Sequence, residues 1–234
     1  MMIMARLLVI ALFCCLVKAT TAQRLTYTMY EILHKEDMKS SPVALQNQYD
    51  GILGNGFFGD NWTAGRAITS MRVYNNLQLR FDVHANKIYL NLNDTVYDIT
   101  QSGIIQFDLF PNAPDTSKVL SFNNGFNVGD VTPDKFVNVL AYGKITLIRY
   151  YFKDIQEVFE SSPTYKEKKF IDKNKYYIIT NGEEGKEIGI NKKNLEKILA
   201  DKWDKVSGYA KEKNISGGNE DGWAKLIDYY NTLP

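Results

Sequence analysis

Apolar and polar residues alternate with a period of two from Arg24 to about Phe152, which is typical of β-strands that bury one face. In the clearest stretch the apolar residues are Leu77, Leu79, Phe81 and Val83, and the residues between them are Gln78, Arg80 and Asp82. After a polar turn at His84–Asn86, the alternation resumes with Ile88, Leu90 and Leu92. The pattern predicts a β-hairpin with one face on a core and its polar side chains toward solvent.

Further short strands are predicted on both sides of this hairpin. They are a run holding Leu25, Tyr27 and Met29, then Thr95–Ile99, Ile104–Phe110, Phe136–Leu140 and Ile145–Phe152. The last is apolar on both faces, so we expect it in the middle of the sheet. No capped helical pattern interrupts these strands, which favours about eight to ten mainly antiparallel strands. They would form a β-sandwich or a partly closed barrel.

The pattern changes after Phe152. A short helical turn is expected at Lys153–Glu160, then a hairpin from Lys175–Thr180 and Lys186–Ile190. Two amphipathic helices follow, one capped by Asn191 and one beginning near Asn219. Their apolar positions are Leu195, Ile198, Leu199, Trp203 and Val206 in the first and Trp223, Leu226, Ile227 and Tyr230 in the second. The predicted class is α+β, divided into a segment 1–22, an antiparallel β domain 23–160 and a C-terminal segment 161–234 packed on it.

The first 22 residues have the pattern of a secretory signal peptide. Arg6 precedes the apolar run Leu7–Val17, and the small-residue segment Ala19–Ala22 follows. The run is about eleven residues, too short to cross a bilayer as a helix. We therefore expect cleavage after Ala22, export to the periplasm or the cell exterior, and no transmembrane segment in the mature chain.

Removal of this segment changes the thiol content and the charge. Cys14 and Cys15 both lie within it, so the mature chain would have no thiol. An alternative is that one of them is the lipidated residue of a lipoprotein, although bulky Leu12 and Phe13 precede them. The formal net charge of +1 becomes about −1 without Arg6 and Lys18, which gives no attraction for nucleic acid.

Several segments together resemble a group of exported, β-rich Bacteroidota proteins of unknown function. The segments are Leu79–Val83, Tyr142–Leu147, Tyr176–Ile179, Asn191–Leu195 and Leu226–Asn231. The resemblance implies a bacterial envelope or extracellular setting and assigns no functional residues.

Metal and nucleophile chemistry lack the necessary residues. With the cysteines removed, His34 and His84 are too few for a zinc site, and no G-x-S-x-G nucleophile elbow occurs. Glycines at 51, 54, 56 and 59 lack the Lys-Ser/Thr of a phosphate-binding loop and predict a tight loop entering a strand near Thr63. The oxygen-rich segment Asn123–Asp130 suits either Ca²⁺ or turn stabilisation.

Carboxylates on strands leave a hydrolase open as an alternative function. A glycoside hydrolase needs two facing carboxyl groups, and Asp82, Asp98 and Asp108 lie on predicted strands. Their positions on the polar side of each alternation favour solvated side chains instead.

Aromatic residues are the best candidates for a binding surface, and we single out Trp62, Tyr74, Tyr97 and Tyr142. The function predicted is non-enzymatic binding or structural interaction at the bacterial envelope, with a protein or a glycan as partner and no cofactor or metal. The alternative is a carboxylate-dependent hydrolase acting on envelope or extracellular carbohydrate. A further possibility is that the C-terminal helices dock a partner protein.

Overall fold

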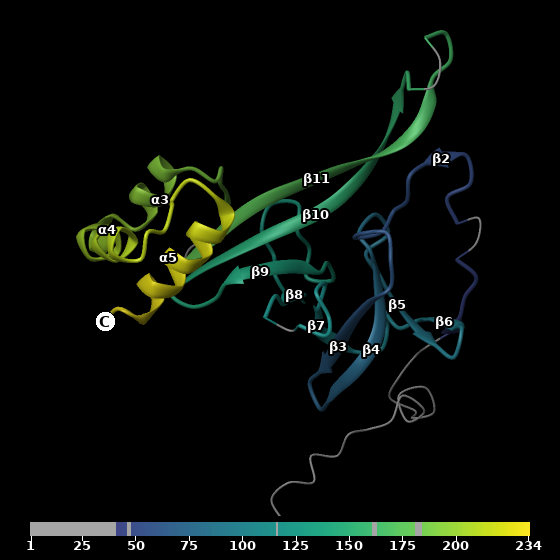
Figure 1. The fold of residues 1–234 in the computed structure, drawn as a ribbon, viewed down its shortest axis with the longest axis horizontal. Helices are drawn as coiled ribbons and strands as arrows, with labels where there is room; N and C mark the ends of the chain where they lie inside the picture. Colours follow the sequence, from purple (N-terminus) through teal and green to yellow (C-terminus); the bar gives the residue numbers. More distant parts are fainter. Residues whose placement is uncertain (1–40, 46–47, 116, 161–162, 181–183) are drawn as a thin grey trace, which may run out of the picture.

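The computed structural model describes residues 41–45, 48–115, 117–160, 163–180 and 184–234 (Figure 1). The predicted signal peptide, the strand around Tyr27 and His34 lie outside these residues. The described chain forms one β-sheet followed by three α-helices. No helix in this part of the chain is long and apolar enough to cross a membrane.

The sheet has twelve strands. In chain order they are β1 (Ser41–Pro42), β2 (Ile52–Leu53), β3 (Thr63–Thr69), β4 (Val73–Asp82), β5 (Lys87–Leu92), β6 (Thr95–Asp98), β7 (Ile104–Leu109), β8 (Leu120–Asn123), β9 (Val137–Ala141), β10 (Ile145–Val158), β11 (Glu167–Thr180) and β12 (Lys186–Glu187). Their spatial order is β1-β6-β5-β4-β3-β7-β8-β9-β10-β11-β12, with β2 also pairing in parallel with β11. All the other pairings are antiparallel. The β-rich α+β class is confirmed, and the strands belong to a single sheet that does not close.

One face of β3, β4, β7 and β8 carries the larger core. Phe107 and Phe122 are cross-strand partners whose stacked rings have centroids 4.9 Å apart. Phe81 and Phe136 pack against Phe107 edge to face, and all four are at most 2 % exposed. Because side chains alternate along a strand, the residues between these positions lie on the opposite face, which we call the outer face.

Strands β10 and β11 form a long twisted hairpin that runs from the helices to the far end of the molecule (Figure 1). The helical turn predicted at Lys153–Glu160 is wrong, because β10 continues to Val158. Ile155 pairs with Phe170 in this stretch. Pairing with β11 therefore determines the conformation of residues 153–158. The boundary predicted at residue 160, between the β domain and the C-terminal segment, falls in the connection between β10 and β11.

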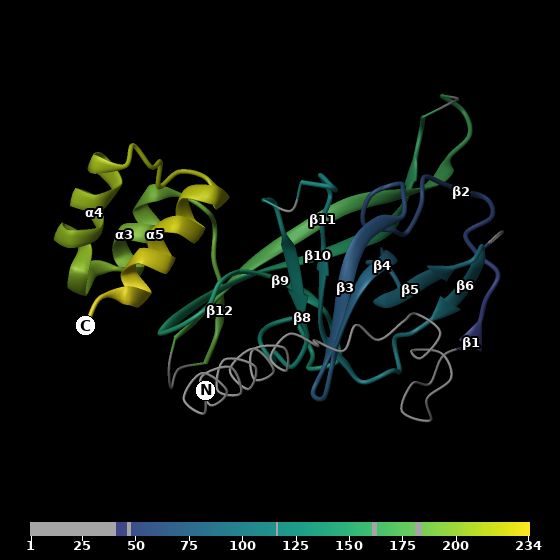
Figure 2. The same cartoon turned by 60° about the horizontal axis from the view of Figure 1, so that its bottom comes forward.

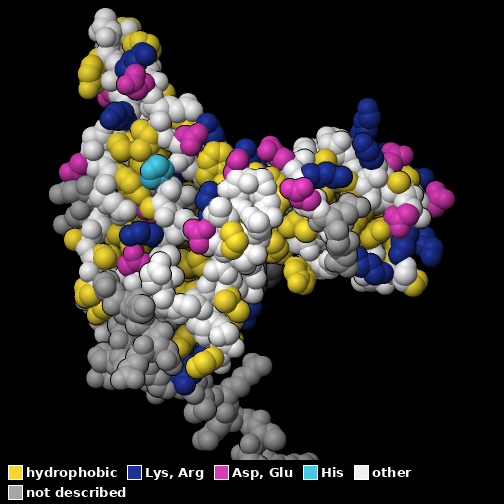
Figure 3. All heavy atoms as spheres, turned by 180° about the vertical axis from the view of Figure 1, so that it is seen from behind, with side chains coloured by type: hydrophobic (Ala, Val, Ile, Leu, Met, Phe, Trp, Pro, Cys, Tyr) yellow, Lys and Arg dark blue, Asp and Glu magenta, His cyan; other side chains and the backbone are white. Residues whose placement is uncertain are grey.

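Charged side chains of opposite sign form pairs along the half of this hairpin that lies farther from the helices. The N–O distances are 3.1 Å for Lys153–Asp172, 2.5 Å for Lys173–Asp154 and 3.6 Å for Lys166–Glu157. At its end, hydrophobic and charged side chains are interspersed on the surface (Figure 3). Such exposed pairs contribute little free energy each, but they leave the hairpin without a strong charge of one sign.

The C-terminal helices pack together at one end of the sheet (Figure 2). They are α3 (Lys192–Ile198), α4 (Trp203–Glu212) and α5 (Glu220–Thr232), with a short 3₁₀ turn, η1 (Ala200–Lys202), between the first two. Asn191 and Asn219 cap α3 and α5, as predicted, by accepting hydrogen bonds from Asn194 N and Gly222 N. Trp223 and Leu226 join Leu147 and Ile178 of the sheet in one buried cluster. The helices therefore cover part of the sheet.

The sequence predicted two helices, and this expectation is wrong because its first helix is interrupted at η1. The Asp201 carboxylate in that turn accepts a hydrogen bond from the Tyr230 hydroxyl, at 3.0 Å and 3.1 Å to its two oxygens. The Lys202 ammonium donates to the Leu233 carbonyl at 3.4 Å. Contacts with the end of α5 thus stabilise the 3₁₀ turn between α3 and α4. The spacing of apolar residues within this segment cannot predict contacts with residues about 30 positions later.

Candidate functional site

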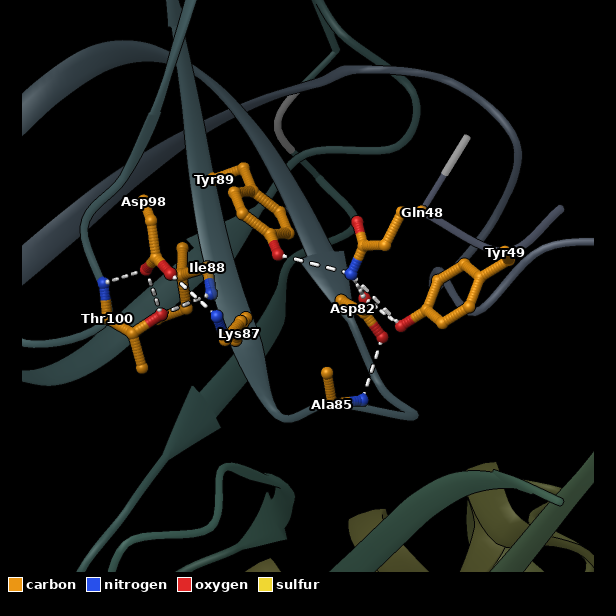
Figure 4. A network of polar contacts seen from close by, with 9 residues as sticks. All are labelled: Gln48, Tyr49, Asp82, Ala85, Lys87, Ile88, Tyr89, Asp98 and Thr100. Atoms are coloured by element: carbon orange, nitrogen blue, oxygen red, sulfur yellow. Dashed lines mark hydrogen bonds and ion pairs between the residues drawn. The ribbon is translucent and has the colours of Figure 1, made fainter. Parts of the chain in front are cut away.

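Asp82 is fully buried, so the expectation of a solvated carboxylate at this position is wrong. One carboxylate oxygen accepts from the Tyr49 hydroxyl at 2.6 Å and from the Gln48 amide at 3.2 Å (Figure 4). The other accepts from the backbone N–H groups of His84 and Ala85 at 3.0 Å and 2.8 Å. A buried carboxylate needs such donors because desolvation penalises its charge. The network fastens Gln48 and Tyr49, which precede β2, to the end of β4.

The Tyr49 hydroxyl is held in its protonated form. Burial raises the pKa of Tyr49 above its ordinary value, and the hydrogen bond to Asp82 and the charge of that carboxylate raise it further. Gly56 packs against both partners, since a Cβ there would lie 2.7 Å from the Tyr49 ring and 3.0 Å from Asp82 Oδ1. The glycine-rich segment thus packs tightly at Gly56 and leads to β3 at Thr63, as predicted, but it also contains β2, which the sequence did not predict.

Asp98, at the end of β6, lies in a second polar group, and β5 separates its strand from β4 (Figure 4). It accepts from the Thr100 hydroxyl at 2.6 Å and the Thr100 backbone N–H at 3.0 Å, and pairs with Lys87 at 3.1 Å. Burial opposes ionisation, but the hydrogen bonds from Thr100 and Lys87 outweigh it and hold the pKa of Asp98 below its usual value. Asp98 is thus an anion that holds a turn together.

Asp108 is also fully buried, against the expectation of a solvated side chain. It accepts from Arg66 Nε at 2.5 Å and from the Gln106 amide at 2.9 Å. Gln106 in turn accepts from the Asn123 amide at 3.1 Å. The result is a polar row across β3, β7 and β8 on the outer face. Sequence reasoning missed Gln106 and considered Asn123 only as part of the Asn123–Asp130 segment. The two residues are 17 positions apart, and only the strand register brings them together.

Trp62, predicted as a binding residue, lines an open hollow of about 470 Å³ at the start of β3. Trp62 is half-buried. Its polar neighbours in the hollow are Asp60, Asn61, Thr63 and Gln78, and its apolar neighbours include Phe58, Phe110 and Pro111. The volume is within the range of small-molecule sites, and we call this feature the Trp62 hollow.

The wall of the Trp62 hollow is fixed by the loop that precedes it. Asn55 donates to the Asp60 carboxylate at 2.9 Å, and Arg80 donates to the Asp60 carbonyl at 3.0 Å. The Arg80 guanidinium also lies 3.8 Å from the centroid of the Phe57 ring. These contacts fix the position of Asp60 in the wall of the hollow without any ligand.

The other three predicted aromatics lie in different environments. Tyr74 is 6 % exposed within the main core, and Tyr97 packs against the same core. Tyr142 is 77 % exposed and lines a second hollow of about 470 Å³, with Gln106, Ser121 and Asn123. The structure thus places Trp62 and Tyr142 at hollows of about 470 Å³, and Tyr74 in the core and at the wall of a smaller hollow of about 220 Å³.

The remaining polar candidates have structural partners. His84 Nδ1 lies 2.8 Å from the Lys153 carbonyl oxygen, and the Asn124 amide donates to the Ile104 carbonyl at 3.0 Å. The Asp130 carboxylate pairs with Lys175. Asn124 and Asp130 therefore hold the 123–130 segment to residues distant in the chain. No group of three or more His, Cys, Asp or Glu suited to a metal occurs in the described part of the chain.

Comparison with known proteins gives no relative for this arrangement. No family model matches the chain, and neither a curated protein nor a solved structure matches it.

Proposed function

We propose that this chain is an exported, non-enzymatic binding protein of the bacterial envelope, and that it binds a glycan in the Trp62 hollow. The observation that carries the proposal is the position of Trp62 beside Asp60, Asn61 and Gln78 in one hollow. Export rests on the N-terminal pattern of Arg6 and Leu7–Val17.

A sugar ring presents a face of C–H groups and a rim of hydroxyl groups. An indole ring offers a large apolar surface for such a face. Carboxylate and amide side chains accept and donate hydrogen bonds in one plane, which suits neighbouring hydroxyls. Trp62 with Asp60, Asn61 and Gln78 supplies both kinds of contact.

A hydrolase acting through the carboxylates predicted on strands has less support. Such an enzyme needs a carboxylic acid with a raised pKa facing a carboxylate across a cleft. Asp82 and Asp108 are occupied by hydrogen-bond donors, and the pKa of Asp98 is lowered. These three carboxyl groups hold strands and loops together through hydrogen bonds and ion pairs.

Intrinsic fluorescence of the mature chain can test the proposal. Trp223 is fully buried, so a Trp203→Phe variant leaves Trp62 as the indole that responds to ligand. We expect a panel of soluble glycans to contain members that change this emission. Because Trp62→Ala removes the responding indole, its affinity is measured by isothermal titration calorimetry, and we expect it to fall at least tenfold, or about 1.4 kcal/mol. The matched control is Tyr165→Ala, which removes a 68 % exposed aromatic from the hairpin end.

Two results would contradict the proposal. One is the absence of binding to every glycan in the panel by a correctly folded protein. The other is equal affinity of Trp62→Ala and Tyr165→Ala for a glycan that does bind. Release of shortened products, detected by mass spectrometry, would favour the hydrolase instead.

A further inference from the structure

The polar row on the outer face begins at a position next to the Trp62 hollow. Ala64 and Gln78 line that hollow and are cross-strand partners on β3 and β4. Arg66 is two residues beyond Ala64 and pairs across the strands with Asp108. Since residues two apart share a face of a strand, Ala64, Gln78, Arg66 and Asp108 lie on the same side of the sheet.

The other end of the row enters the second hollow. Gln106 and Asn123 are cross-strand partners on β7 and β8, and both line this hollow. Its rim has Tyr142 in the turn between β9 and β10, and Asp228 on α5. We call it the Tyr142 hollow.

The row retains hydrogen-bonding capacity after its internal bonds are made. Each side-chain amide carries two N–H groups, and the row uses one from Gln106 and one from Asn123. Arg66 pairs through Nε and its side chain is 41 % exposed. The internal bonds fix the orientation of these groups, which reduces the ordering cost of binding.

We infer that the Tyr142 hollow is a second subsite, and that the ligand is an extended polyhydroxylated chain, an oligosaccharide, lying along the polar row from Trp62 to Tyr142. This inference rests on the proposed glycan binding. Strands β3 and β9 are three strand spacings apart, or about 14 Å. A single sugar ring cannot span that distance, whereas a chain of several rings can contact both aromatics.

The test uses ladders of cello-, chito- and manno-oligosaccharides from one to six units, titrated into the mature chain by calorimetry. We expect affinity in the ladder that binds to rise about tenfold or more between the shortest and longest members. Tyr142→Ala should reduce the affinity of the longest member to that of the shortest and leave the shortest unchanged. Asn123→Ala should weaken only the long members, and Tyr165→Ala should change neither.

The outcomes separate this inference from the proposed function. If short members bind through Trp62 but affinity is independent of length, or if Tyr142→Ala has no effect on long members, the second subsite is disproved and the Trp62 site stands. If a folded protein binds no member of any ladder, both proposals fail for these sugars. Tyr142 is 77 % exposed, so its replacement should not disturb folding.

Discussion

The side-chain amide of Asn231 satisfies both backbone polar groups of Ile145, a residue 86 positions earlier in the chain. The Ile145 N–H donates to Asn231 Oδ1 at 2.9 Å, and Asn231 Nδ2 donates to the Ile145 carbonyl at 2.8 Å. Gly143 approaches the same amide so closely that a Cβ would lie 2.8 Å from Asn231 Cγ. The last turns of α5 are thereby fixed on the turn between β9 and β10.

Asn231→Ala should lower the free energy of unfolding by about 2 kcal/mol, because it leaves a buried backbone N–H and C=O without partners. Ile145 is only 4 % exposed, so water cannot replace the lost bonds easily. Chemical denaturation followed by circular dichroism measures the change. Lys225→Ala removes an exposed ion pair from the same helix and should cost less than about 0.5 kcal/mol. Equal midpoints for the two variants would contradict the role of Asn231.

Asp82→Asn should destabilise the fold by about 2 kcal/mol, since the side-chain oxygens of Asp82 accept from four donors and an Asn NH₂ group cannot accept. Tyr49→Phe removes one of those donors and should cost about half as much. Thermal and urea unfolding of both variants checks the order. Phe keeps the ring contacts of Tyr49 with Phe57 and Phe170, so this variant tests the hydroxyl alone. A larger loss for Tyr49→Phe than for Asp82→Asn would contradict the prediction.

The lowered pKa of Asp98 predicts a specific acid sensitivity. A carboxyl whose pKa is lower in the folded than in the unfolded chain contributes stability above the unfolded pKa of about 3.9, and this contribution is lost as pH falls through the folded pKa. Asp98→Asn should therefore reduce stability at neutral pH and flatten its decrease below about pH 4. Urea midpoints between neutral pH and pH 3 measure this. Glu196→Gln, at an exposed site on α3, is the control, and an unchanged acid slope in Asp98→Asn would refute the prediction.

Two helical glycines should respond in opposite directions to alanine. A Cβ at Gly222 would lie 1.6 Å from the Ser216 backbone oxygen, so Gly222→Ala must displace the segment before α5 and should cost more than about 2 kcal/mol. Gly208 in α4 is exposed and has nothing within 4 Å of a Cβ. Gly208→Ala should stabilise by about 0.5–1 kcal/mol through helix propensity. Differential scanning calorimetry can compare the pair, and the same sign for both would contradict it.

The sequence by itself determined the elements whose signals are local. Period-two alternation located β4 and β5 around the His84–Asn86 turn, and Asn191 and Asn219 marked the starts of two helices. Of the four aromatics that it singled out, Trp62 and Tyr142 line hollows of about 470 Å³, whereas Tyr74 and Tyr97 pack in or against the core, and their binding role stays a prediction. These features depend on residues a few positions apart, so they can be deduced without knowing which strands pair.

Only the tertiary structure decided how distant polar residues are used. Alternation placed Asp82 and Asp108 on the polar side of their strands, yet both are buried, because Tyr49 covers one and Arg66 pairs with the other. The strand at Val158 and the interruption at Asp201 likewise depend on partners far along the chain. A polar side chain on a strand is stable when water solvates it or when it is buried beside hydrogen-bond donors. Strand order and register determine which of these two environments it has.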